Sequence, residues 1–329
     1  MVQNLDVPVL ADANANALTI KGYEPKDLRS AYHIPDGGSD KTVAIVDAYD
    51  NPLVESDLAV YRAAFNLPAC TTQNGCFRKV NQGGNSAAYP APDAAWAKEI
   101  ALDVEMVSAT CPACKILLVE ANSSSIDDLG ASVDEAVTLG ASAVSNSYAA
   151  PEYSGELASE QHFNHVGVAV TASSGDNGIG ATYPAASLYV TAVGGTIMSG
   201  SNGSYAETGG WKNTGRGCSL YIRKPWWQAN FQQCTGRAMT DVSALADPAS
   251  GVAVYDTFTN AGQSGGWMVL GGTSVGAPII ASAYALAADF SGRNSAARLY
   301  WRHQYLTDVP PAGYDYPTGN GSPNGLGAF

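Results

Sequence analysis

The chain has 329 residues, of which 46% are hydrophobic and only 14% are charged, so it can form one large α/β domain or two smaller ones. Acidic residues outnumber basic ones 30 to 17, the net charge is −13, and Lys and Arg form no cluster, which argues against nucleic acid or an anionic membrane as a partner. No apolar stretch reaches the roughly 18 residues that cross a bilayer.

Short β-branched runs alternate with helical patterns along the chain. The strands we expect are Thr42–Asp47, Lys115–Glu120, Ser142–Ser147, Gly167–Ser173 and Tyr189–Val193. The helices we expect are Val54–Phe65, Ala94–Ala109, Ser125–Leu139 and Ser274–Phe290. Residues 195–235 are rich in Gly, Ser and Trp without a clear period, and we expect loops with short hairpins there. The alternation predicts a single α/β domain over residues 1–329, with a doubly wound, mainly parallel sheet and helices on both faces.

In such a sheet, ligands bind beyond the carboxyl ends of the strands. The loops to examine are therefore those that follow the expected strands. Three of them carry unusual polar residues, at 46–50 (VDAYD), 145–152 (SNSYAAPE) and 173–180 (SSGDNGIG).

The six cysteines form three pairs that are each close in sequence. They are Cys70 and Cys76, Cys111 and Cys114, and Cys218 and Cys234. Three local disulfides are the simplest interpretation and imply an oxidising compartment. The alternative is that C-P-A-C is a redox or zinc motif. A redox motif normally opens a helix after a strand, however, and zinc would need a second closely spaced pair.

Ser274 lies in GGTSVGAP, directly before a long apolar run. Two glycines allow a sharp turn into the helix, so the serine could be a nucleophile or an ordinary helix cap. Pro278 lacks the N–H that would otherwise bond the carbonyl of Ser274. The pattern alone favours the cap, because caps far outnumber catalytic serines.

A serine nucleophile needs a base, and the chain has only four histidines, His33, His162, His165 and His303. None lies in a sequence setting typical of a Ser-His-Asp triad. The expected helix at 94–109 offers another base.

Glu99 and Asp103 lie four residues apart on that helix, so both carboxyls project from one face beside an apolar stripe. Two such acids cannot both ionise easily and can share one proton, which would make them a base. The alternative is a solvated acidic face, which we expect for the neighbouring Glu105.

Asp176 follows a strand in S-S-G-D-N-G. It could be a turn aspartate. A carboxyl that stays protonated in a dry site can also donate a hydrogen bond to an oxyanion, as in ketosteroid isomerase, which is a known example of this device.

In chain order E-x-x-x-D, S-S-G-D and G-T-S-x-x-x-P, the chain resembles the sedolisins, the serine-carboxyl peptidases. The likeness runs from about Ala31 to the C-terminus. It includes VAIVDAYD, VSNSY, YPAAS, TAVGGT and TDVSALADP. The resemblance implies a subtilisin-like fold and acid-acting endopeptidase activity on peptide or protein substrates.

The resemblance also implies a role for each matching residue. Ser274 would be the nucleophile, Glu99 its general base and Asp103 the residue that orients Glu99. Asp176 would donate to the oxyanion together with the N–H of Ser274. Asp47 would extend the hydrogen-bond chain to Asp103. A strand edge would pair with the bound peptide, formed by Ser145, Asn146, Ser147, Tyr148 and Ala149.

Sedolisins also bind one calcium ion near the C-terminus, through oxygen ligands. The candidate ligands here are Asp308, Val309, Pro311, Gly313 and Asp315. The loop between the two aspartates is shorter than is usual in the family, so either the site survives in contracted form or it is lost.

Further departures are Ile100 in place of a tryptophan, Tyr148-Ala149 in place of Trp-Gly, and GGTS in place of SGTS. Sedolisins are made with a large N-terminal prosegment, and the start of this chain lacks a signal peptide, so we expect the mature form of a secreted monomer. Two alternatives are an inactive relative that acts as a binding or structural protein, and a neutral Ser-His-Asp hydrolase.

Overall fold

The computed structural model describes residues 3–5, 20–38, 40–178, 180–230, 234–260, 264–287 and 290–329. Within them, eight strands form the central sheet in the order β10-β9-β7-β5-β2-β4-β3, with β13 also paired to β9. Every pair is parallel except β10 with β9. The strands are β2 (Thr42–Ala48), β3 (Phe77–Asn81), β4 (Lys115–Ala121), β5 (Ala143–Asn146), β7 (Ala169–Ser173), β9 (Val190–Ser201), β10 (Ser204–Gly210) and β13 (Val242–Leu245).

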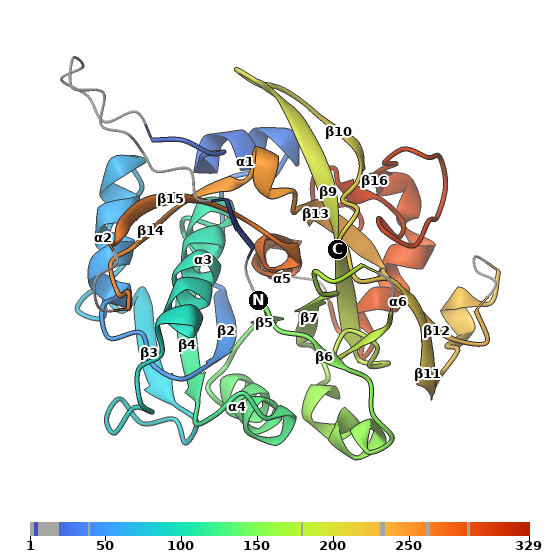
Figure 1. Ribbon diagram of the computed structural model, residues 1–329, viewed down its shortest axis with the longest axis horizontal. Coiled ribbons are helices and arrows are strands. Elements are labelled where there is room, and N and C mark those ends of the chain that lie inside the picture. Colours follow the sequence, from blue (N-terminus) through green and yellow to red (C-terminus); the bar gives the residue numbers. More distant parts are fainter. Residues whose placement is uncertain are drawn as a thin grey trace.

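Helices cover both faces of this sheet (Figure 1). They are α1 (Pro25–Ala31), α2 (Val54–Ala64), α3 (Ala94–Thr110), α4 (Ile126–Thr138), α5 (Thr273–Ala287) and α6 (Ser295–Trp301). Short 3₁₀ helices are η1 (Glu156–Phe163), η2 (Trp226–Gln228), η3 (Pro248–Ser250) and η4 (His303–Tyr305). Smaller sheets use β1 (Gln3–Leu5), β6 (Ala150–Pro151), β8 (Thr182–Tyr183), β11 (Gly217–Arg223), β12 (Gly236–Met239), β14 (Val252–Asp256), β15 (Gly266–Gly271), β16 (Leu306–Thr307) and β17 (Ser322–Pro323).

Side-chain alternation divides the core into two layers. On β2, Ile45 packs with Val104 of α3 in one buried cluster. The next residue, Val46, packs with Val133 of α4 in another. Helices α3 and α5 therefore lie on one face of the sheet and α4 on the other, as expected for a doubly wound fold.

Helix α5 runs through the middle of the molecule, between α3 and β13 (Figure 1). Every residue from Thr273 to Ala285 is buried, which explains why this segment is apolar on all sides. Gly276 allows the close packing against β9, because a Cβ there would lie 2.8 Å from Val193. The packing fixes α5 relative to the carboxyl ends of the strands.

The predicted fold class and the five strands are confirmed, with ends that shift by at most two residues except at the end of β9, which runs on past Val193 to Ser201. Of the helix expected at Ser274–Phe290, residues 288 and 289 lie outside the described part. The expectation of loops with short hairpins over residues 195–235 is wrong in one respect. Strand β9 continues to Ser201 and pairs with the seven-residue β10; residues 231–233 are not described.

The three predicted disulfides are present: Cys70–Cys76, Cys111–Cys114 and Cys218–Cys234. The C-P-A-C segment is therefore not a zinc site, because both of its sulfurs are bonded to each other. None of the described helices is both long enough and apolar enough to cross a lipid bilayer.

Candidate active site

Ser274 is the second residue of α5 and is 1% exposed. The helix begins at Thr273, so Ser274 does not occupy the cap position. Gly272 makes the turn between β15 and α5 with a φ of 118°, and a Cβ on it would lie 2.8 Å from Asp176 Oδ2. Glycine is therefore required at 272 for both its backbone conformation and its lack of a side chain.

Ser147 joins the end of β5 to the start of α5. Pro278 has no N–H to give to the carbonyl of Ser274, and the Ser147 hydroxyl donates to that carbonyl instead, at 3.3 Å. In return the Ser274 hydroxyl donates to the carbonyl of Ser147, at 3.5 Å. These two contacts hold the candidate nucleophile against the carboxyl end of the sheet.

The acid pair lies on the buried helix α3, where Glu99 is 3% and Asp103 is 0% exposed. Burial raises the pKa of Asp103 well above its usual range, the charge of Glu99 raises it further, and the nearby Ser147 side chain lowers it. Glu99 and Ser147 also line one small cavity of about 70 Å³, together with Trp96 and Tyr148. Ser147 thus contacts Ser274 on one side and the acid pair on the other.

Asp176 follows β7 and is fixed to the residue before Ser274. Its Oδ1 accepts hydrogen bonds from the Thr273 N–H and from the Thr273 hydroxyl, both at 2.8 Å. The Thr273 hydroxyl also accepts from the N–H of Gly175, at 3.1 Å. Burial raises the pKa of Asp176 although the bonds from Thr273 lower it. Burial therefore favours the neutral form of this carboxyl.

Asp47 occupies the carboxyl end of β2 and is fully buried. Burial raises its pKa well above the usual range, and the charges of Asp103, Glu99 and Glu120 raise it further. The structure therefore groups Asp47 with the acid pair. The proximity of Glu120, on the neighbouring strand β4, was not visible in the sequence.

The expected substrate strand edge has to be shortened. Ser145 and Asn146 pair with β2 on one side and with β7 on the other. Their backbone groups are therefore already used within the sheet and offer no edge to a peptide. Ser147, Tyr148 and Ala149 follow the strand and line the small cavity. Asn146 instead fixes Tyr148, whose hydroxyl donates to Asn146 Oδ1 at 2.7 Å.

The candidate calcium ligands lie in a tight turn. Both carboxylate oxygens of Asp308 accept from the N–H of Gly313, at 3.1 and 2.9 Å. Asp315 Oδ1 accepts from the N–H of Thr318, at 2.9 Å, whereas Asp315 Oδ2 is buried without a hydrogen-bond partner in the described residues. Burial raises the pKa of Asp315, and the nearby charge of Asp308 adds to it. Two neighbouring carboxylates, one with an unsatisfied oxygen, fit an oxygen-liganded cation.

No group of three or more His, Cys, Asp or Glu side chains in the described chain is arranged to hold a metal. A cation at the C-terminal turn would therefore depend on the carbonyls of Val309, Pro311 and Gly313 in addition to the two aspartates. Backbone carbonyls are ordinary calcium ligands, so this composition suits calcium better than zinc.

Three of the four histidines contact partners other than Ser274, and the fourth is exposed. The rings of His162 and His165 both contact the carboxylate of Asp134 on α4, at 2.6 and 3.2 Å. His303 bonds the carbonyl of Tyr300, at 3.0 Å, and His33 is an exposed residue with positive φ in the loop after α1. These placements do not support a Ser-His-Asp arrangement at Ser274.

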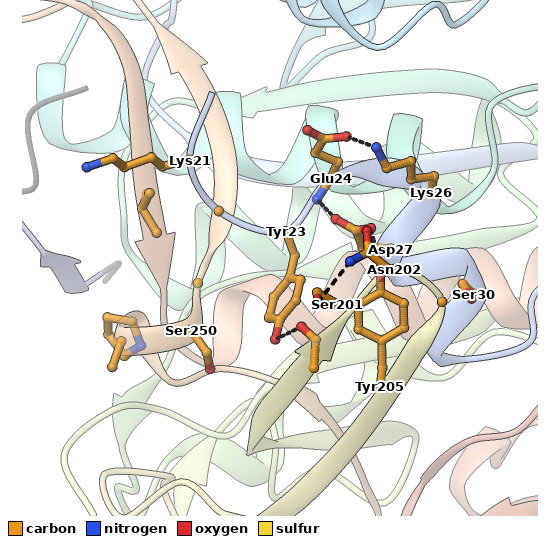
Figure 2. A pocket seen from close by; sticks show the side chains of 17 residues that line it. Lys21, Tyr23, Glu24, Lys26, Asp27, Ser30, Ser201, Asn202, Tyr205 and Ser250 are labelled. Carbon is orange, nitrogen blue, oxygen red and sulfur yellow. Dashed lines mark hydrogen bonds and ion pairs between the residues drawn. The ribbon is translucent and has the colours of Figure 1, made fainter. Parts of the chain in front are cut away.

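A larger cavity of about 790 Å³ lies between α1, the β9–β10 hairpin and η3 (Figure 2). Its polar groups bind one another: Lys26 pairs with Glu24 at 2.8 Å, and the Tyr205 hydroxyl donates to Asp27. The Tyr23 hydroxyl, also in this cavity, bonds the carbonyl of Gly200. None of the candidate catalytic residues lines it.

Comparison with protein-family models gave no match. The chain is 30% identical to kumamolisin of Bacillus sp. (strain MN-32) over 313 residues, which cover 82% of this chain and 53% of the relative. The chain thus spans about half the length of that relative. It is 29% identical to sedolisin of Pseudomonas sp. (strain 101) over 189 residues, covering 50% of this chain and 30% of that protein.

Two solved structures illustrate the similarity of fold. Pseudomonas sedolisin, a serine-carboxyl proteinase complexed with two molecules of pseudo-iodotyrostatin, gives a TM-score of 0.79 at 24% identity, covering 93% of this chain and 96% of that one. The S41 psychrophilic protease gives a TM-score of 0.60 at 17% identity, covering 93% and 99%. At these identities the structural matches show a shared fold.

Proposed function

Because the chain belongs to the sedolisin family, we propose that it is a serine-carboxyl endopeptidase that cleaves peptide bonds in acid. Ser274 attacks the carbonyl carbon of the scissile bond, and the acid pair Glu99/Asp103 accepts the hydroxyl proton. Asp176 and the N–H of Ser274 stabilise the oxyanion. The amine leaves with a proton from the pair, and water then hydrolyses the acyl-enzyme.

The observation that carries this proposal is the position of Ser147 between Ser274 and the buried acid pair. The hydroxyl of Ser274 and the carboxyls of the acid pair thus lie around Ser147, at the strand ends where α/β proteins bind ligands. In acid an imidazole is already protonated, whereas two adjacent carboxyls that share one proton still offer an ionised oxygen as the base.

We propose that the peptide substrate pairs its backbone with Ser147–Ala149, the part of the expected edge that the sheet leaves open. The small cavity lined by Trp96 and Tyr148 lies beside this segment. It is suited to a single substrate side chain next to the scissile bond. The precursor would carry an N-terminal prosegment and the mature enzyme would act as a monomer. The three disulfides support secretion into an oxidising compartment.

Several buried acids outside the site also support an acidic working range. Burial raises the pKa of Asp256 to about 6 and that of Glu156 to about 7. In the unfolded chain such groups titrate near pH 4. Their contribution to folding stability is therefore complete below about pH 4 and is lost as the pH rises toward the folded-state values. The fold should be most stable where the proposed chemistry operates.

The test is digestion of a denatured protein mixture across the pH range, with cleavage sites mapped by mass spectrometry. We expect cleavage in acid that declines as the pH rises through the pKa of Asp176, because its ionisation removes the oxyanion donor. A bell-shaped profile centred near pH 8 would instead support a neutral Ser-His-Asp hydrolase. No cleavage at any pH would support an inactive relative.

We also propose that the C-terminal turn binds one calcium ion through Asp308, Asp315 and the carbonyls of Val309, Pro311 and Gly313. The ion would neutralise two adjacent carboxylates and hold the turn closed. Chelation at pH 5 should lower the melting temperature by roughly 5 °C, and Ca²⁺ but not Mg²⁺ should restore it.

Without a chelator, the Asp315→Asn variant should already have the lower melting temperature of the chelated wild type. Adding a chelator should not lower it further. Asp36→Asn is the matched control, because Asp36 is an aspartate whose side chain is 95% exposed. Equal responses to chelation in the wild type and in Asp315→Asn would refute a calcium site in this turn.

A further inference from the structure

A row of ionisable side chains continues from the acid pair to the edge of the sheet. Ile45 of β2 and Leu118 of β4 pack in the core on the α3 side. Alternation places the residues two positions later, Asp47 and Glu120, on the same side. They are register partners on these adjacent parallel strands. Glu120 is fully buried, so a fourth carboxyl lies next to Asp47 at the carboxyl end of the sheet.

Lys79 of the edge strand β3 is the last residue of this row, next to Glu120. Its Nζ lies 3.2 Å from Glu120 Oε1, pairs with Asp50, and donates to the carbonyl of Asn51 at 2.9 Å. The Asn51 N–H donates to the same Glu120 oxygen at 3.1 Å, and the Asn51 side chain donates to the carbonyl of Ala97 on α3 at 3.0 Å. The side chain of Lys79 is only 12% exposed. This cluster thus links the edge strand to the helix that carries the acid pair.

The two oxygens of Glu120 have different surroundings. Oε1 receives both donors, whereas Oε2 is buried without a hydrogen-bond partner in the described residues. Both carboxylate oxygens of Asp47 are also buried and have no hydrogen-bond partner in the described residues. A buried carboxylate oxygen without a donor is costly. A proton on Glu120 would remove the charge from its unsatisfied oxygen and could be shared with a neighbouring carboxyl, either Asp50 or the register partner Asp47.

Charge and burial support a neutral Glu120. Burial raises its pKa to about 8; Lys79 opposes this effect and Asp50 adds to it. Ionisable groups of several other elements also face this cluster. They are Asp47 of β2, Glu99 and Asp103 of α3, and Tyr89, whose ring centre lies 4.3 Å from Lys79 Nζ. Glu55 of α2 and Arg78 of β3 line the same outer cavity as Lys79.

We propose that Lys79 and Glu120 are positioning residues that keep the catalytic acid pair ionised in acid. Neutral Glu120 donates its Oε2 proton to Asp47. The ammonium of Lys79 stabilises the negative charge that Asp47 shares with the pair. The inference rests on the proposed function, because only there does the pair act as a base.

The test is the pH profile of kcat/KM on a peptide substrate, whose acid limb reports ionisation of the base in the free enzyme. Lys79→Met and Glu120→Leu should each move this limb upward by roughly 0.5 to 1 pH unit, because each makes the shared negative charge costlier. Lys79→Arg keeps the charge and Glu120→Gln keeps a donor, so both should move it by less than half as much.

Lys115→Met is the matched control. It removes the same charge from an exposed position at the opposite end of β4, and its acid limb should coincide with that of the wild type. A downward movement in Glu120→Leu would mean that Glu120 carries a negative charge, and an unchanged limb in both Lys79→Met and Glu120→Leu would mean that the cluster is only structural. Either result overturns the proposal.

An infrared titration tests the neutral Glu120 without any turnover. The wild type should show a protonated carboxyl band at pH 6 that is missing from Glu120→Gln, and equal spectra would contradict the assignment. If Ser274→Ala were fully active, the proposed function would fail while this spectroscopic result still stood. The two failures are therefore distinguishable.

Discussion

Replacing Ser274 by alanine is expected to lower kcat for peptide hydrolysis by about 10⁶-fold, the size of effect found for removal of the nucleophile in subtilisin. The alcohol forms the covalent intermediate, and neither Glu99 nor Asp176 can take that role from its position. The fold should persist, because alanine keeps the helix and the Ser274 carbonyl still accepts from Ser147. Initial rates at about pH 4 and thermal unfolding of both proteins give the result.

Ser282→Ala is the matched control for this prediction. Ser282 lies on the same helix, is equally buried, and its hydroxyl has no hydrogen-bond partner in the described residues. Its loss should change kcat by less than about twofold. Comparable losses in the two variants would point to damage of α5 rather than to a nucleophile, and full activity of Ser274→Ala would remove Ser274 from the mechanism.

The sheet could be predicted because its strands carry the strongest local signal. Runs such as TVAIVDA and KILLVEA are β-branched and apolar on both sides, which is typical of strands buried between two layers of helices. The second half of β9 lacks that signal. Its sequence beyond Val193 is GGTIMSGS, and it is a strand because β10 and β13 pair with it. Tertiary pairing overrides weak propensity there.

For Glu105 the prediction from the sequence is wrong. Its place on α3 predicts a solvated face, but it is 1% exposed. Its carboxylate accepts from the N–H of Tyr255, at 2.9 Å, because the β14–β15 sheet covers that side of α3. The contact spans 150 residues of sequence. A helical period indicates which residues share a face but not what will cover it.

In the candidate site, some residues could be predicted from motifs, whereas the contacts that join them could not be predicted. The identities of Ser274, Glu99 and Asp103 came from ordered motifs rather than from periodicity, since each motif alone had a structural explanation. The connecting role of Ser147 had one local signal, the proline four residues after Ser274, which leaves a carbonyl in need of a donor. Nothing in the sequence identified the donor, because β5 and α5 meet only in the folded chain.

Asp176→Asn is expected to reduce kcat by about 10²- to 10³-fold at pH 4, within the range measured for loss of one oxyanion donor. Asparagine Oδ1 can still accept from the Thr273 N–H and hydroxyl, so the local fold is kept. Its amide is a weaker acid than a carboxyl and donates with different geometry. The loss should appear in kcat more than in KM, because the donor acts on charge that develops in the transition state.

The pH profile of this variant separates the oxyanion role from a structural one. Burial raises the pKa of Asp176, so the wild type keeps its donor in acid and loses it as the pH rises through that value. An amide does not titrate, and the residual activity of Asp176→Asn should therefore persist to higher pH than that of the wild type. Asp128→Asn is the control, since this carboxylate of α4 also accepts hydrogen bonds, from Gln82 and Ser123, but lies on the other face of the sheet. If Asp176→Asn lost its activity at the same pH as the wild type, another group would be the titrating donor.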